Sequence, residues 1–531
     1  MLSNWVTRIE GLDKSILRKY FTVDSPLGPL DASRVVDGSV IELLTDRELL
    51  LLHGQHTSPS IVIGRRGSGK TSYLRRLQIE NPTSPFIELR TSRTFNALVS
   101  AMTEAASDGV TAELLADVWD AIFWIVLAWK VHSSGRPRIG LIKVREHVKA
   151  LGLDQCHSFD AVTDRLGRIF ALARQADGDF AIDFVLSMLS KGASLEDVKS
   201  LLCRDIQEQG LHAFIVMDSL DDYPLDVVKF RKALAGLLKC AGRFNSVETP
   251  YQVRLCLPAE LYWEFVDEIS SNSAKDFSNQ AILHWPVGEL LVVASRRLMI
   301  FLFLFHEDIY ARVRNFPLET RSDAQEFLLS VFPKTLENLA GRRERTIEYL
   351  LRHTQLLPRQ LLMYLTEIVK INGVENRDGK HGNELFSESS VRLGIRDTED
   401  RVCQAIWGVF KHRYPSAQEV CKRLIPALPR VFTNDDLRKV VSDFSYERSG
   451  KTYNGSVQHI KRLLIEIGAV GKVWRTTQEY VEGRFEYALA GSLPVSEGDS
   501  MCLHPVFQRT CDSIRKSNRE IPVLPLSSDL T

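Results

Sequence analysis

The sequence lacks several features that would exclude or assign a function class at once. Its eight cysteines include no C-x-x-C pair and no dense cluster, so neither a disulfide framework nor a structural zinc site is expected. Its two most apolar runs, 121–129 and 298–305, are far shorter than the roughly 20 residues that span a bilayer. The N-terminal stretch has no apolar segment followed by a small-residue cleavage site, so no secretory signal is expected. These absences predict a soluble cytoplasmic protein with reduced thiols.

The chain also lacks an excess of either charge, with 67 Lys and Arg against 67 Asp and Glu. This balance cancels the long-range field that would draw the whole molecule onto nucleic acid or an anionic membrane. Any basic surface must therefore be local. What the sequence does have is 531 residues, of which 44% are hydrophobic and 25% charged, enough for two to four domains with packed cores.

Strand patterns alternate with helical patterns over the first half of the chain. A short β-branched run at 61–63 leads through a glycine-rich turn into a helical pattern, and further strand candidates lie at 86–90, 213–217 and 253–257. Helical periodicity fills residues 111–210. The alternation predicts an α/β fold, with a parallel sheet covered by helices on both faces.

The glycine-rich turn carries the most informative motif. It is a full G-x-x-x-x-G-K-[ST] sequence between strand and helix, made of Gly64, Arg65, Arg66, Gly67, Ser68, Gly69, Lys70 and Thr71. Its glycines let backbone N–H groups wrap a phosphate, while Lys70 reaches the β and γ phosphates and the Thr71 hydroxyl ligates Mg²⁺. An ordinary glycine turn would explain the glycines alone. The motif predicts a P-loop that binds ATP with Mg²⁺.

A P-loop needs a second acidic group to hold the metal, and the buried strand 213–217 ends at Asp218. Asp222 and Asp221 follow within reach, so one of them can orient or deprotonate the attacking water. The alternative for these carboxylates is a helix cap or turn before Pro224, and it suits Asp221 better than Asp218.

The segments IVIGRRGSGKTS and FIVMDSLDDY resemble those of the AAA+/STAND class of P-loop ATPases. HWPVGELLVVASRRL, from His284, is similar to the tryptophan-anchored helix that opens the lid in related bacterial ATPases. HTQLLPRQLL is similar to the sensor-2 helix of origin-recognition-type AAA+ proteins, which implies that Arg359 senses the γ-phosphate. The strand 253–257 looks like the sensor-1 strand, but its tip lacks a polar residue. Arg296 and Arg297 could act as arginine fingers in a neighbouring subunit or lie on a solvated helix face, and both alternatives stay open.

The last part of the chain reads as short helices followed by a two-stranded ribbon at 469–474 and 484–491, the order of a winged helix. The helix 456–467 would be its recognition element. From residue 401 onward 19 Lys and Arg face 14 Asp and Glu, a mild excess. Basic residues on this helix and ribbon could contact phosphates or another protein, and both alternatives stay open: Lys461, Arg462, Lys472, Arg475 and Arg484.

The expected domain organisation follows from these segments. It comprises a P-loop NTPase domain (1–284) with an N-terminal extension and a helical insertion at about 111–210, a helical lid (285–371), a linker (372–398) and a winged-helix domain (399–531).

The resemblance implies an ATPase that acts as a conformational switch, coupling its ATP state to homo-oligomerisation or to a partner effector protein. It also implies a setting in a bacterial defence or mobile-element system. One alternative is a DNA-binding initiator or loader that places the winged helix on duplex DNA. The other is a scaffold that binds ATP without turnover.

Overall fold

The structure is a computed structural model that describes residues 4–45, 59–89, 93–105, 111–133, 139–173, 181–218, 228–244, 250–260, 262, 280–338, 341–375, 385–411, 413–441, 445–448, 451–454, 456–488, 493–512 and 522–525. The chain divides into two compact units. We call Leu52–Gly64 with Leu74–Leu283 the sheet unit. We call Met1–Leu51, Arg65–Tyr73 and His284–Thr531 the lid unit.

The sheet unit is built on five parallel strands in the order β2-β3-β4-β1-β5. All residues of β1 and β3 are buried, and their continuous β-branched and apolar sequences suit strands covered on both faces. The strand bounds are β1 (Ile61–Gly64), β2 (Phe86–Leu89), β3 (Ala213–Met217), β4 (Tyr251–Pro258) and β5 (Gln280–Ile282).

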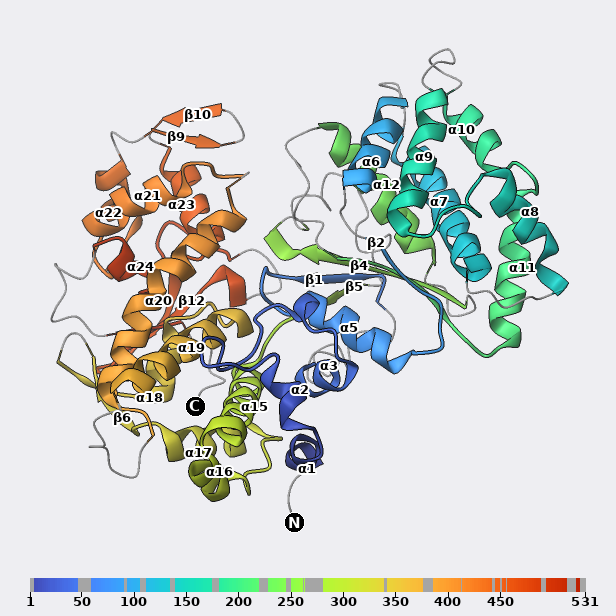
Figure 1. The fold of residues 1–531 in the computed structure, drawn as a ribbon. Helices are drawn as coiled ribbons and strands as arrows, with labels where there is room; N and C mark the ends of the chain where they lie inside the picture. The colour runs from blue at the N-terminus through green and yellow to red at the C-terminus, as the bar shows by residue number, and fades with distance from the viewer. Residues whose placement is uncertain are drawn as a thin grey trace. The chain divides into compact units, whose positions relative to one another are not determined.

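Helices cover both faces of this sheet, with α5 on one side and α7 and α12 on the other (Figure 1). Tertiary contacts tie the helices into the core of the sheet: Trp119 Nε1 donates to the Ala233 carbonyl at 3.0 Å, and Trp124 stacks on Tyr251 of β4 at 4.7 Å between ring centroids. The helices of this unit are α5 (Lys70–Glu80), α6 (Arg93–Ala105), α7 (Ala112–Ser133), η2 (Ile139–Leu141), α8 (Ile142–Ala150), α9 (Phe159–Ala173), α10 (Ala181–Leu189), α11 (Leu195–Glu208) and α12 (Val228–Phe244).

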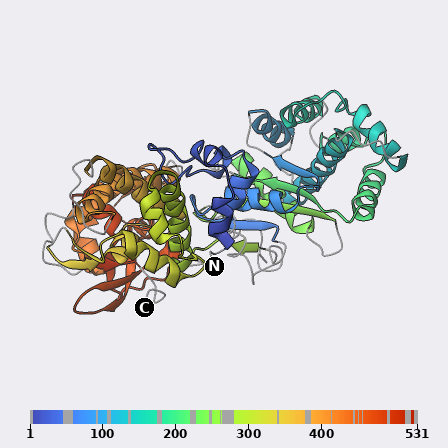
Figure 2. The same ribbon diagram turned by 60° about the horizontal axis from the view of Figure 1, so that its bottom comes forward.

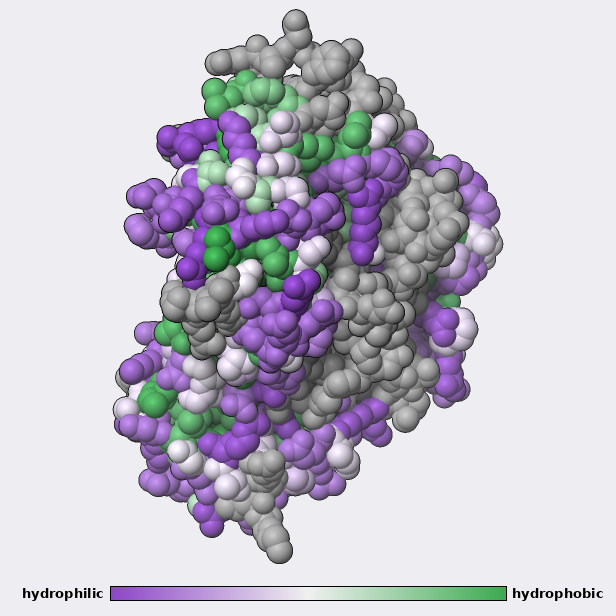
Figure 3. Space-filling model, turned by 90° about the vertical axis from the view of Figure 1, so that its right-hand side faces the viewer, coloured by the Kyte–Doolittle hydropathy of each residue, from purple (hydrophilic) through white to green (hydrophobic). Residues whose placement is uncertain are grey.

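The helices between β2 and β3 gather at one end of the sheet unit in both ribbon views (Figure 2). Their apolar faces join the sheet residues in one continuous core. Figure 3 shows one face of the molecule, on which hydrophilic side chains predominate and smaller hydrophobic areas lie among them. Among the described residues, the helical stretch between β2 and β3 shares the core of the sheet.

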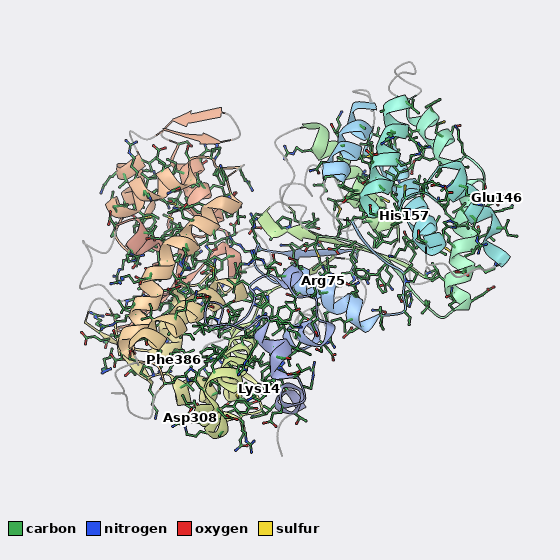
Figure 4. All side chains as sticks on the ribbon, in the orientation of Figure 1. Lys14, Arg75, Glu146, His157, Asp308 and Phe386 are labelled. Atoms are coloured by element: carbon green, nitrogen blue, oxygen red, sulfur yellow. The ribbon has the colours of Figure 1, made fainter. Side chains whose placement is uncertain are left out.

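The lid unit joins N-terminal helices to the lid helices that follow the sheet. Arg296 on α15 lies over the Trp5 ring at 5.3 Å, and the Tyr310 hydroxyl donates to Glu10 at 3.0 Å. Lys14, labelled in Figure 4, lies 4.5 Å from the centroid of the Phe303 ring. These elements are α1 (Asn4–Glu10), α2 (Lys14–Arg18), η1 (Ala32–Arg34), α3 (Gly38–Leu44), α15 (Val287–Phe305), α16 (Glu307–Val313), α17 (Arg321–Val331), β6 (Thr335–Glu337), β7 (Arg343–Arg345), α18 (Thr346–Arg352) and α19 (Pro358–Glu375).

The C-terminal part of the lid unit contains helices followed by the antiparallel pair β11 and β12, the winged-helix order that the sequence predicts. A five-stranded sheet in the order β14-β12-β11-β13-β8 closes it. Its elements are α20 (Glu388–Val409), α21 (Ala417–Leu424), η6 (Ile425–Ala427), β8 (Val431–Phe432), α22 (Asn434–Val441), β9 (Ser445–Arg448), β10 (Lys451–Asn454), α23 (Val457–Glu466), β11 (Val470–Thr476), β12 (Val481–Arg484), η7 (Glu486–Ala488), β13 (Met501–Leu503), α24 (Pro505–Thr510) and β14 (Val523–Leu524).

Three details differ from the sequence expectation. The hairpin β9–β10 lies between α22 and α23, where no strand was expected. The second ribbon strand covers 481–484 and ends where 484–491 was expected to begin, because Phe485 turns inward to stack on Tyr487. In the expected linker 372–398, α19 continues to Glu375 and α20 begins at Glu388.

The apolar runs 121–129 and 298–305 lie in α7 and α15, where nearly all their side chains are buried. Across the described ranges, the structure has no helix with the length and apolar character needed to cross a membrane. Protein packing accounts for both runs.

Candidate nucleotide-binding site

The loop between β1 and α5 has the backbone that its glycines permit. Gly67 and Gly69 have φ angles of +89° and +96°, in a region that side-chain-bearing residues rarely adopt. The Ser68 N–H donates to the Arg65 carbonyl at 3.0 Å, and the Tyr73 N–H closes the first helical turn on the Gly69 carbonyl at 2.9 Å. The loop thus turns the chain into the N-terminus of α5, where backbone N–H groups favour an anion.

Lys70 and Ser68 are both buried. Lys70 is 7% exposed, and its ammonium donates to the Arg65 carbonyl at 3.3 Å. Ser68 is 1% exposed, and its hydroxyl oxygen is buried without a hydrogen-bond partner among the described residues. A buried hydroxyl of this kind costs free energy unless another group satisfies it.

Trp285 fixes the loop from the lid side. Its indole N–H donates a 2.6 Å hydrogen bond to the Ser68 carbonyl, and its side chain is 2% exposed. It stands just before α15, at the place of the tryptophan in the resemblance to lid-anchoring helices. The hydrogen bond thus joins the beginning of the lid to the middle of the loop.

Arg359 approaches the same loop from the first turn of α19. A Cβ placed on Gly67 would lie 3.2 Å from the Arg359 Cβ and 3.5 Å from its Cδ. Any side chain at Gly67 would therefore displace this arginine. The pKa of Asp31 lies below its ordinary value. Burial is the largest influence and raises this pKa, but hydrogen bonding from Ser33 and nearby charges, that of Arg359 among them, together lower it by more.

Arg65 extends from the loop toward the winged helix. Its guanidinium carbon lies 5.4 Å from the centroid of the Tyr487 ring. Residues 65 and 487 are far apart in the sequence, and no sequence signal could have identified this contact.

Asp218 follows β3 directly and is described within the sheet unit. β1 and β3 both pair with β4: Gly64 lies opposite Pro258, and Met217 opposite Leu255. The carboxyl ends of parallel strands share one edge of a sheet, so Asp218 stands at the same edge as the end of β1. One intervening strand separates them, or about 10 Å at the usual spacing between neighbours. α/β sheets bind ligands at the carboxyl ends of their strands, next to the point where the order of the strands reverses. This edge of the sheet is such a place.

The remaining candidates have different outcomes. Asp221 and Asp222 lie outside the described residues, and their roles stay predictions.

Arg296 is 5% exposed and donates to the Leu318 carbonyl and to Glu319, while Arg297 donates to the Leu27 and Pro29 carbonyls. Within this chain both arginines bind neighbouring segments of the lid unit.

The basic residues expected on the winged helix are largely engaged in contacts of their own domain. Arg462 forms ion pairs with Glu466 at 2.6 Å and with Glu486 at 2.9 Å. Lys461 donates to the Val495 carbonyl at 2.9 Å. Lys472 pairs with Asp499 at 2.8 Å. A phosphate contact by these side chains would have to replace an existing protein contact.

The wing presents a different surface at Trp474. Trp474 is 53% exposed and sits at a break in register between β11 and β12, where Val473 faces Gly483 and Arg475 faces Glu482. Arg484 covers one face of its ring, with the guanidinium carbon 3.2 Å from the centroid. Bulges commonly re-aim a side chain, and this one presents an exposed indole beside cationic groups.

Several features of the loop fit a bound nucleotide. Gly67 and Gly69 adopt the backbone of a phosphate cradle, and the buried Ser68 hydroxyl has capacity for one more hydrogen bond. Lys70 and Thr71 begin α5. When bound, Mg²⁺ would neutralise charge on the β and γ phosphates, and the assignment of Thr71 and Asp218 as its ligands stays a prediction.

The fold is an α/β P-loop NTPase core with helical additions and a C-terminal winged helix. No protein-family model matches the chain, and no curated protein sequence matches it. Three similar solved structures are the Aeropyrum pernix ORC2 protein in ADPNP–ADP complexes (12% identity, 91% of this chain and 92% of that chain, TM-score 0.38), the ADP form of ORC2 (12%, 91% and 94%, 0.31) and the Aeropyrum pernix ORC1 protein in complex with DNA (12%, 89% and 91%, 0.29).

Proposed function

We propose that the chain binds and hydrolyses ATP at the loop 64–71 and uses the nucleotide state as a conformational switch. The observation that carries this proposal is the approach of Arg359 to Gly67 within a complete G-x-x-x-x-G-K-T loop. A lid cation beside a phosphate-binding loop can respond to the charge of the γ-phosphate, because that charge is present in ATP and absent in ADP.

Each proposed role follows from the chemistry of the side chain. Lys70 stabilises the charge that develops on the transferring phosphoryl group. Thr71 and Asp218 hold Mg²⁺. Asp222, or less favourably Asp221, positions the attacking water. Arg359 binds the γ-phosphate from the lid, and its release after hydrolysis is the switching event.

The output of the switch is proposed to be a change in self-association or in the binding of a partner protein. The engagement of Lys461, Arg462 and Lys472 within their own domain counts against the DNA alternative, because a phosphate contact by these cations would have to replace an intramolecular contact. A setting in a bacterial defence or mobile-element system stays a prediction from the resemblance.

A DNA-binding initiator or loader is the second candidate function. It is favoured by the exposed Trp474 beside Arg475 and Arg484, since cationic side chains contact phosphates and an exposed indole can stack or insert between bases. If this candidate holds, duplex affinity falls steeply as salt rises, because counterions are released on binding.

Steady-state phosphate release tests the proposed function. We expect Mg²⁺-dependent turnover of ATP by the wild-type chain, and loss of that turnover when Mg²⁺ is chelated. Tight ATP binding with no phosphate release would instead identify a nucleotide-binding scaffold. Absence of nucleotide binding would contradict the proposal altogether.

A further inference from the structure

The second residue of the phosphate loop is held by the winged-helix domain. The Arg65 guanidinium carbon is 5.4 Å from the Tyr487 ring centroid, and Tyr487 is 7% exposed. A cation over an aromatic face is attracted by the ring quadrupole, and the attraction grows when the pair is shielded from water. The enclosed ring therefore makes this contact stronger than a surface pair.

Tyr487 cannot move independently of its domain. It stacks on Phe485 with ring centroids 5.5 Å apart and an interplanar angle of 15°, and its hydroxyl lies 2.6 Å from His504 Nε2. His504 is fully buried and caps α24 by accepting the Val506 N–H at 3.1 Å. A displacement of Tyr487 would therefore disturb η7 and α24 together.

The charge of Arg65 also acts on the two neighbours of Tyr487. Burial raises the pKa of Glu486, and the charges of Arg462 and Arg65 oppose that rise. Burial lowers the pKa of His504, with His353 and Arg65 contributing in the same direction. A change in the position of Arg65 would alter the field at this whole cluster.

The backbone of Arg65 takes part in the phosphate loop itself. Its carbonyl accepts hydrogen bonds from the Lys70 ammonium at 3.3 Å and from the Ser68 N–H at 3.0 Å. A phosphate at the loop would compete with this carbonyl for Lys70. The same residue would thus feel the nucleotide through its backbone and the winged helix through its side chain.

We propose that Arg65 transmits the nucleotide state of the loop to the winged helix, a regulatory step that rests on the proposed function. Its guanidinium rests on Tyr487 in the docked form, and the phosphates of bound ATP draw it off the ring. A guanidinium is attracted more strongly to a phosphate than to an aromatic ring at the same distance, because the phosphate carries a full negative charge and the ring only a quadrupole. Losing Arg65 loosens the contact of residues 485–487 with the loop.

Amide hydrogen exchange of the segment 481–488, measured on the full chain with and without Mg²⁺ and a non-hydrolysable ATP analogue, tests this step. In the wild type we expect the analogue to raise the exchange rate of the segment at least about threefold, which corresponds to the lower end of the free energies of cation–π contacts. In Arg65→Gln, exchange is already raised and the analogue adds nothing. Arg345→Gln, at an exposed position of the lid outside the phosphate loop, should behave like the wild type.

A second pair of variants separates the ring from the hydroxyl. Tyr487→Phe keeps the ring under Arg65 and should keep the response to the analogue. Tyr487→Leu removes the ring that competes with the phosphates for Arg65. Because the ring contact and the phosphate contact exclude each other, the affinity for the analogue should then rise roughly threefold to thirtyfold. If Tyr487→Leu does not fold, the exchange comparison between Arg65→Gln and Arg345→Gln decides.

The outcomes distinguish this inference from the proposed function. A wild-type chain that binds the analogue with unchanged exchange at 481–488 would overturn the inference and leave the ATPase proposal intact. Equal responses in Arg65→Gln and the wild type would also overturn it. A wild-type chain that binds no nucleotide would overturn both.

Discussion

The indole nitrogen of Trp285 donates a 2.6 Å hydrogen bond to the carbonyl oxygen of Ser68. Both residues are almost completely buried, so the bond is shielded from competing water. Trp285 directly precedes the first lid helix, and Ser68 lies in the middle of the phosphate loop. The conformation of the loop therefore depends on the position of the lid as well as on its own glycines.

Replacing Trp285 with phenylalanine removes the N–H and part of the ring. We expect the free energy of unfolding to fall by about 1–3 kcal/mol, because the Ser68 carbonyl loses its donor and a small cavity remains. Nucleotide affinity should fall as well. Trp5→Phe is the matched control, since the buried Trp5 indole nitrogen has no partner among the described residues. If both variants keep wild-type affinity in a nucleotide titration, the lid anchor has no part in binding.

Arg359→Ala is expected to keep ATP binding and to cut phosphate release at least about tenfold, because the lid loses the cation that responds to the γ-phosphate. Arg345→Ala serves as the control, because its side chain is 80% exposed on the lid and pairs only weakly with Glu348 at 3.3 Å. Steady-state phosphate release at saturating ATP compares the two. Equal turnover in both variants would contradict the assignment of Arg359.

Asp218→Asn should weaken binding of ATP in the presence of Mg²⁺ and leave binding without Mg²⁺ nearly unchanged, because only the metal contact is lost. Asp222→Asn should keep binding and lower turnover at least about tenfold, because a water-positioning carboxylate loses its charge. Asp221→Asn tests the less favoured candidate for the same role. Glu208→Gln, at the exposed end of α11, is the control. Wild-type phosphate release in every variant would mean that the metal-binding strand has been misassigned.

Arg462→Ala should act on stability first. Its guanidinium bridges Glu466 and Glu486, and its removal takes one cationic partner from each of these carboxylates. Glu466 keeps Arg413 and the Tyr414 hydroxyl, and Glu486 keeps the Leu493 N–H. We expect the free energy of unfolding to fall by about 1–3 kcal/mol, less than for a fully buried pair because the arginine side chain is 38% exposed. Denaturant titration measures this loss, and gel shifts on duplex DNA should stay blank for the variant and the wild type. Submicromolar duplex affinity of the wild type at physiological salt would contradict the preference for a protein contact.

The parts that the sequence predicted correctly are those in which a local pattern determines the structure. The run Ile61–Gly64 forms a buried strand because its residues are apolar and lead directly into a turn that needs positive φ at Gly67 and Gly69. The strand before Asp218 is predictable for the same reason. The parallel sheet follows from the alternation of such strands with helices.

The parts that could not be predicted depend on contacts between distant segments or on weak local patterns. The Lys70 side chain is buried and its ammonium binds the Arg65 carbonyl, and nothing in the motif indicates this. The hairpin β9–β10 is short and polar, so it has no apolar alternation to identify it. The short helix α24 was not predicted either; His504 caps it, and it begins at Pro505, a favoured first helical residue.

ATP binding by the loop 64–71 is tested most directly by a titration of wild-type and Lys70→Ala chains with a fluorescent ATP analogue in the presence of Mg²⁺. We expect saturable binding by the wild type and a loss of at least about 100-fold in affinity for Lys70→Ala, because the cation aimed at the β and γ phosphates is gone. Circular dichroism and denaturant titration would establish that the variant is folded. Unchanged affinity in a folded Lys70→Ala chain would contradict the assignment of the nucleotide-binding site.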